Sequence, residues 1–92
     1  MLKLKAAKSG NRFDRTSLSA KAGSVTIRMQ NPSGADSQHA VAVSGGGVSR
    51  KGKVVDPGGT STVKVKLKKG SYQYFCPVAG HRATMKGKLK VS

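Results

Sequence analysis

Residues 71–85 read SYQYFCPVAGHRATM, an aromatic run followed by a loop that carries three side chains with metal-binding atoms. The aromatic run has the composition of a β-strand. The loop holds Cys76, His81 and Met85 within ten residues, and Cys76 is the only cysteine of the chain. Pro77 has no backbone N–H to donate, so it stops the strand from continuing inside a sheet. The stretch therefore predicts a strand that delivers a thiolate, an imidazole and a thioether to one loop.

Strand-like alternation also dominates the rest of the chain. Apolar side chains alternate with polar or basic ones, as in half-buried antiparallel strands. The alternating runs are residues 2–6, 25–30, 39–44, 63–68 and 88–91. Turn residues separate them, and no stretch has the period of an amphipathic helix. The pattern predicts an all-β sandwich or barrel, with a single domain over residues 1–92. We expect the glycine-rich, basic residues 44–53 to be a flexible connection between sheets.

A second histidine, His39, lies upstream at the start of an apolar run. Two imidazoles, one thiolate and a weakly bound axial thioether are the ligands of a trigonal copper site for electron transfer. Each of these residues alone is more often structural, as a buried cysteine, a core methionine or a solvent-facing histidine. Their order and spacing together predict a site for one copper ion. Its expected ligands are His39, Cys76, His81 and Met85.

Residues 74–89, YFCPVAGHRATMKGKL, resemble the copper-binding loop and last strand of small bacterial cupredoxins. The Cys-x4-His-x3-Met spacing is similar to that of azurin, and it is wider between Cys and His than in plastocyanin. A looser similarity extends to residues 13–23, 25–27, 39–41 and 70–74. The resemblance implies a Greek-key β-sandwich of seven or eight strands, one type 1 copper ion and one-electron transfer. It also implies that the ring edge of His81 is the electron port.

One residue departs from the family pattern close to the expected site. Many cupredoxins follow the upstream histidine with an asparagine whose side chain pins the cysteine loop, but this chain has Ala40. The missing hydrogen bond must come from Ser37 or from a backbone amide, or be absent.

The charge of the chain bears on its partners. Eighteen Lys and Arg residues against three Asp and Glu give a net charge of +15. Such a field attracts acidic protein surfaces or the anionic face of a membrane. With the resemblance, it predicts a monomeric electron carrier that meets an acidic redox partner protein.

No run is long enough for a transmembrane helix, and no signal peptide is present. We expect Met1 to open a mature domain whose export signal or anchor precedes it, placing the protein in the periplasm or elsewhere outside the cytoplasm.

Other functions compete with electron transfer. A periplasmic copper carrier that delivers its metal would use the same four ligands, and two histidines, one cysteine and a water could hold zinc instead. A basic β-barrel that binds nucleic acid needs exposed aromatic platforms, whereas Tyr72, Tyr74 and Phe75 lead directly into Cys76. An enzyme with a Cys–His nucleophile needs an orienting acid or amide, which the motif lacks. We therefore expect neither nucleic-acid binding nor enzymatic activity.

Overall fold

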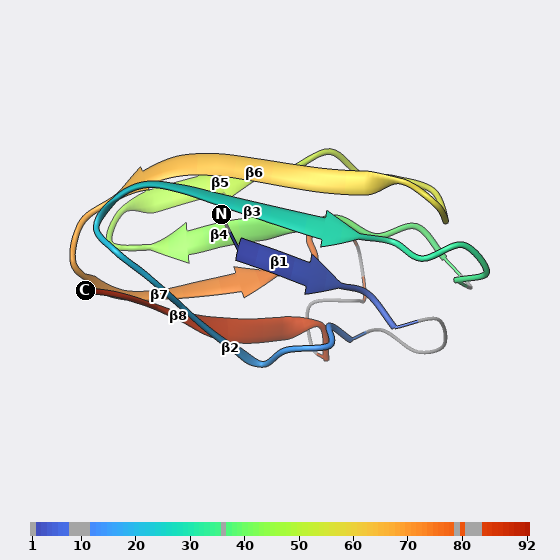
Figure 1. The fold of residues 1–92 in the computed structure, drawn as a ribbon, viewed down its shortest axis with the longest axis horizontal. Coiled ribbons are helices and arrows are strands. Elements are labelled where there is room, and N and C mark those ends of the chain that lie inside the picture. Colours follow the sequence, from blue (N-terminus) through green and yellow to red (C-terminus); the bar gives the residue numbers. More distant parts are fainter. Residues whose placement is uncertain (1, 8–11, 36, 79, 81–83) are drawn as a thin grey trace.

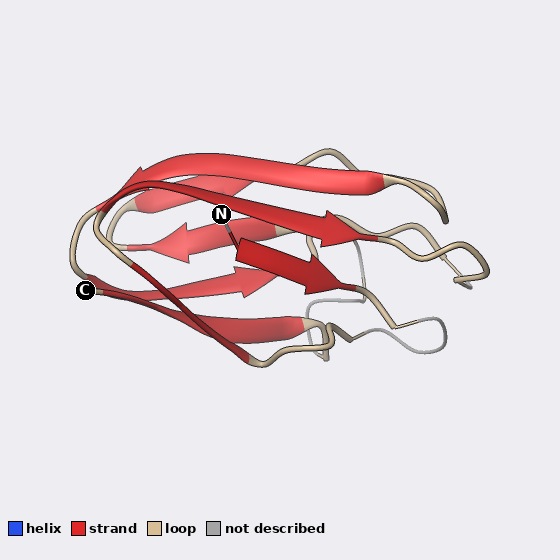
Figure 2. Cartoon of the chain, viewed as in Figure 1, coloured by secondary structure: helices blue, strands red, loops and turns tan. Residues whose placement is uncertain are grey.

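The computed structural model describes residues 2–7, 12–35, 37–78, 80 and 84–92. In this part of the chain the regular structure consists of eight β-strands without a helix (Figure 2). The strands are β1 (Leu2–Lys5), β2 (Ser17–Ala20), β3 (Gly23–Gln30), β4 (Ala42–Gly45), β5 (Val48–Lys51), β6 (Thr60–Leu67), β7 (Gly70–Phe75) and β8 (Lys86–Val91). The described residues thus contain no helix that could cross a membrane. The predicted all-β fold of seven or eight strands is confirmed.

The strands form two sheets that face each other as the layers of a sandwich (Figure 1). One sheet has the order β1-β3-β6, and the other has the order β2-β8-β7-β4-β5. β1 runs parallel to β3 and β2 runs parallel to β8, while the remaining pairs are antiparallel. The chain passes from one sheet to the other between β1 and β2, β2 and β3, β3 and β4, β5 and β6, and β6 and β7. Most contacts are therefore between segments that are distant in sequence.

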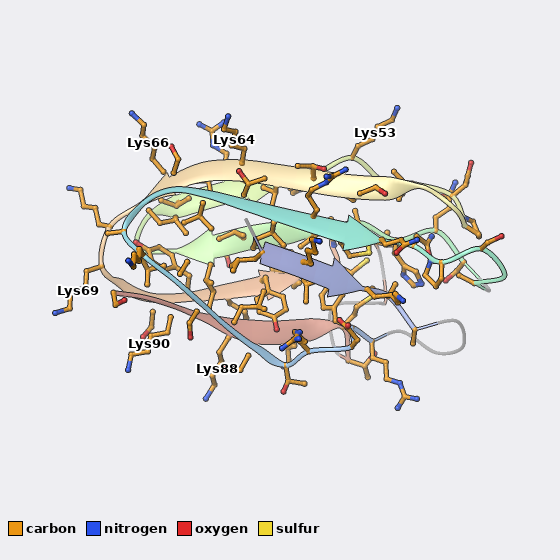
Figure 3. All side chains as sticks on the ribbon, in the orientation of Figure 1. Lys53, Lys64, Lys66, Lys69, Lys88 and Lys90 are labelled. Carbon is orange, nitrogen blue, oxygen red and sulfur yellow. The ribbon has the colours of Figure 1, made fainter. Side chains whose placement is uncertain are left out.

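Alternation along the strands explains which faces pack together. In β6 every second residue is buried, and Lys64 and Lys66 lie at the exposed positions between them. β8 alternates in the same way, with Lys88 and Lys90 exposed. These lysines point away from the two outer faces of the sandwich (Figure 3). The apolar faces meet in one core of Val, Leu, Ile and Met side chains, where each fully buried side chain contributes about 1.5–3 kcal/mol.

The expectation for residues 44–53 is wrong. Instead of a flexible connection between sheets, β4 and β5 form a hairpin within one sheet, with Gly45 paired to Val48. The two turn residues, Gly46 and Gly47, have φ of 54° and 80°. A two-residue hairpin turn requires positive φ at both central positions, and glycine adopts it without strain. The run of glycines is therefore a turn signal. β5 and β2 are the two strands that neither the alternation nor the aromatic run predicts.

The segments of the expected metal site meet at the end of the sandwich opposite this hairpin turn. β7 ends at Phe75 and β8 begins at Lys86, and these two residues are paired. Phe75 is also paired with Ala42, the first residue of β4. The residues that follow β7, precede β8 and precede β4 therefore lie next to one another.

Candidate metal centre

Cys76 and Met85 occupy the two ends of the loop between β7 and β8. Cys76 follows the last residue of β7, and Met85 precedes the first residue of β8. The backbone N–H of Cys76 donates to the carbonyl of Met85 at 2.9 Å. Both side chains are 0% exposed. The sheet therefore fixes the base of the loop and holds a buried thiol and a buried thioether at it.

His39 approaches this site from the segment that leads into β4. The predicted strand at residues 39–44 begins later than expected, at Ala42, and His39 forms an isolated bridge with Val55. The two residues exchange backbone hydrogen bonds of 3.2 and 2.9 Å. The His39 side chain is fully buried, and its Nε2 lies 3.4 Å from the hydroxyl of Ser37. The histidine is thus held through both its backbone and its ring.

The backbone amide of Ala40 connects the two parts of the site. Its N–H donates to Sγ of Cys76 at 3.5 Å, in a fully buried environment. The contact to the cysteine sulfur is therefore made by a backbone amide. Ser37 contacts His39 instead. A hydrogen bond to a sulfur ligand is one of the interactions by which a protein sets the redox potential of a bound metal.

The structure brings together three of the four predicted ligands at this end of the sandwich: His39, Cys76 and Met85. His81 lies outside the described residues. Within the described ranges, no three His, Cys, Asp or Glu side chains gather where they could hold an ion. The donors present are one imidazole, one thiol and one thioether. This soft set fits copper better than calcium or magnesium, which prefer oxygen ligands.

Tyr74 supports the strand that leads to Cys76. Its ring is fully buried and packs against Phe13, with 5.6 Å between the ring centroids. Its hydroxyl donates to the carbonyl of Arg15 at 2.7 Å. Burial, followed by the negative charge of Asp14, raises the pKa of Tyr74 to about 12. The phenol therefore stays neutral at physiological pH and serves as a fixed hydrogen-bond donor.

One buried polar residue near the site, Asn31, is not among the predicted site residues. Asn31 directly precedes Pro32, in a stretch whose residue types indicate a turn, yet its side chain is fully buried. The signal was present in the alternation, because Val25, Ile27 and Met29 are the buried residues of β3 and the next inward position is residue 31. An asparagine on that face indicates a specific hydrogen-bonding role.

Comparison with known proteins assigns the chain to a family. A family model described as the cupredoxin-like domain matches residues 4–91. The chain belongs to the cupredoxin-like family. No curated protein sequence gives a match to this cupredoxin.

Solved structures share the fold over nearly the whole chain. Auracyanin B is 23% identical, with a TM-score of 0.86, and the match covers 99% of this cupredoxin and 87% of auracyanin B. Auracyanin A, a "blue" copper protein from Chloroflexus aurantiacus, is 23% identical with a TM-score of 0.81, covering 99% and 97% of the two chains. An azurin from Methylomonas sp. strain J is 18% identical with a TM-score of 0.77, covering 98% and 95%. At these identities the likeness establishes the fold.

Proposed function

We propose that this cupredoxin binds one type 1 copper ion and carries single electrons between redox partner proteins. The proposed ligands are His39, Cys76, His81 and Met85. The observation that carries the proposal is the buried Cys76 sulfur, which accepts the Ala40 N–H at one end of a rigid sandwich, beside His39 and Met85. Copper, when bound, supplies the one-electron couple Cu(I)/Cu(II). The blue copper protein auracyanin A, which has the same fold, supports this assignment.

The chain contributes rigidity and exclusion of water. His39 is tied to Val55 by two backbone hydrogen bonds, and Cys76 is tied to Met85 by one. Side chains held in this way change position little when the charge of the site changes, so reorganisation is small and electron exchange is fast. Their complete burial also favours retention of a metal over its release to another protein. These features favour electron transfer over copper delivery as the function of the site. We infer that the protein is an electron carrier and not an enzyme.

A surface hollow beside the cysteine is the proposed docking site for the partner. It has a volume of about 490 Å³ and is lined by Ser44, Ser49, Lys51, Phe75, Pro77, Val78 and Gly80. Phe75 and Pro77 directly precede and follow Cys76 in the chain. The lining of the hollow therefore includes both sequence neighbours of the residue that carries the buried sulfur. Val78 and Pro77 supply apolar contact and Lys51 supplies positive charge. A small patch of this kind fits the brief contacts of electron carriers with an acidic partner.

The distribution of lysines over the sandwich fits long-range electrostatic attraction between this protein and a negatively charged partner. Lysines project from both outer faces of the sandwich and from the turn between β6 and β7 (Figure 3). We infer a monomer in one domain, located outside the cytoplasm, that approaches acidic proteins or anionic membranes. Fractionation of the source cells tests the location, and recovery in the cytoplasm would contradict it.

Titration with Cu²⁺ tests the proposed function directly. The metal-free protein should bind one equivalent of Cu²⁺ and develop an intense blue colour from thiolate-to-copper charge transfer. Voltammetry of the blue form should then give a reversible one-electron wave. A colourless complex would contradict the type 1 assignment and favour zinc. A blue protein that exchanges electrons slowly and releases copper readily would favour delivery.

Charge reversal at Lys51 tests the proposed docking site. We expect Lys51→Glu to slow oxidation of the reduced protein by hexacyanoferrate(III), an anionic probe, about threefold or more at low ionic strength. The control is Lys69→Glu, which makes the same change in net charge at the opposite end of β7 and should have a smaller effect. In stopped-flow experiments the oxidation rates of both variants should approach the wild-type rate as the salt concentration rises. Screening by salt shortens the range of the electrostatic interaction to about 3 Å at 1 M. Equal slowing by the two variants would contradict docking at this hollow.

A further inference from the structure

Asn31 makes a set of hydrogen bonds that core packing does not explain. Its side-chain Nδ2 donates to the carbonyl of Ser37 at 3.0 Å and to the carbonyl of Val55 at 3.1 Å. Its backbone N–H donates to the carbonyl of Gly59 at 2.9 Å, and its carbonyl accepts from the N–H of Gly58 at 2.6 Å. Burying N–H groups costs free energy unless they are hydrogen-bonded, as the Nδ2 and backbone N–H groups of Asn31 are. One buried side chain therefore connects the end of β3 to two other segments.

Both carbonyls that bind the Asn31 amide belong to residues that hold His39. Val55 exchanges two backbone hydrogen bonds with His39. Ser37 places its hydroxyl 3.4 Å from Nε2 of the His39 ring. Asn31 thus fixes the partner of the His39 backbone and the partner of its ring at the same time. Movement of either segment would change the direction in which the imidazole points.

The contacts of Ala40 and Ser61 serve other parts of the site. The residue after His39 is Ala40, which has no polar side chain and reaches Cys76 only through its backbone N–H. Ser61, which is also buried, accepts the N–H of Val41 at 3.3 Å and supports the chain beyond Ala40. The side-chain hydrogen bonds of Asn31 and the contact of Ser37 lead to His39.

We propose that Asn31 is a positioning residue for the metal centre: its amide holds Ser37 and Val55 so that His39 keeps its ligand orientation before and after the metal binds. This inference rests on the proposed copper function. Its chemistry requires a donor of two hydrogen bonds, because both partners are carbonyl oxygens. The Oδ1 atom is buried and receives no hydrogen bond from the described residues, so the amide acts through its nitrogen.

The test compares Asn31→Leu with Gln38→Leu. Both replace an amide by a branched alkyl group of similar size, and Gln38 also bridges the same two segments, through its contact with Asp56 at 2.6 Å. Of these two amides, Asn31 donates to Ser37 and Val55, whereas Gln38 contacts Asp56. We expect copper-loaded Asn31→Leu to remain blue, because Cys76 is intact, but to bind copper about 10-fold or more weakly. Its reduction potential and the copper hyperfine splitting in electron paramagnetic resonance should also shift. Gln38→Leu should match the wild type in all three measurements.

A second variant keeps the test decisive if Asn31→Leu folds poorly. Ser37→Ala removes only the hydroxyl beside the His39 ring, at a half-buried position. It should unfold in urea at the wild-type midpoint and still show a shifted potential and hyperfine splitting. A purely structural role would lower stability and leave the potential and the spectrum unchanged, which would overturn the inference. A wild-type protein that does not turn blue would overturn the copper proposal itself, so the two failures are distinguishable.

Discussion

The Cys76→Ser variant is expected to lose the blue absorption completely. The colour of a type 1 centre comes from charge transfer between a thiolate and Cu²⁺, and a serine hydroxyl is a hard donor that binds copper weakly at neutral pH. Because serine is close to cysteine in size, the fully buried site should not collapse around it. Absorption and electron paramagnetic resonance spectra after addition of one equivalent of Cu²⁺ provide the measurement. Any bound copper should show the spectrum of an ordinary cupric complex.

Two controls make this loss specific to the sulfur. The urea unfolding midpoint of metal-free Cys76→Ser should stay near that of the wild type, because the Ala40 N–H that donates to Sγ can donate to a hydroxyl instead. The Met85→Gln variant should keep the blue colour and change the reduction potential, since the axial ligand tunes potential without forming the chromophore. Retention of the blue band in Cys76→Ser would show that this sulfur is not the metal ligand.

The loop that carries these residues was predictable because its chemistry is local. Cys76, His81 and Met85 are close in sequence, and a soft donor set at fixed spacing has few other uses. The link to His39 is not local: it depends on the pairing of β4 with β7 and on a hydrogen bond from Ala40 across 36 residues. The ligand role of all four side chains stays a prediction.

The strands also differ in whether their local sequence pattern predicts them. β6 and β8 were predicted because each buries one face and exposes lysines on the other. β2 and β5 were missed because each has four residues and too few apolar positions to show a period. The role of Asn31 was missed for a different reason. Its partners, Ser37 and Val55, come together only when β3 and the segment before β6 pack side by side.

The Gly87→Ala variant is expected to lose about 3 kcal/mol in the free energy of unfolding, at the upper end of the cost of overpacking a core. Gly87 is paired with Tyr74 across β7 and β8. A Cβ at position 87 would clash with Cζ and the hydroxyl oxygen of Tyr74, with Cε2 only 2.7 Å away. The ring cannot move aside, because it packs against Phe13 and its hydroxyl is bound to the Arg15 carbonyl. Urea unfolding of the metal-free protein measures the loss.

A double-mutant cycle separates this clash from a loss of glycine flexibility. In a Tyr74→Leu background the smaller side chain leaves room for the methyl group, so Gly87→Ala should cost less than about 1 kcal/mol there. The difference between its costs in the two backgrounds is then well above the error expected for independent substitutions. The φ of Gly87 is not positive, so the backbone itself tolerates alanine. An equal cost in both backgrounds would contradict the steric explanation. Because β8 begins directly after Met85, the single variant should also shift the reduction potential, whereas the double variant should restore it toward the value of Tyr74→Leu alone.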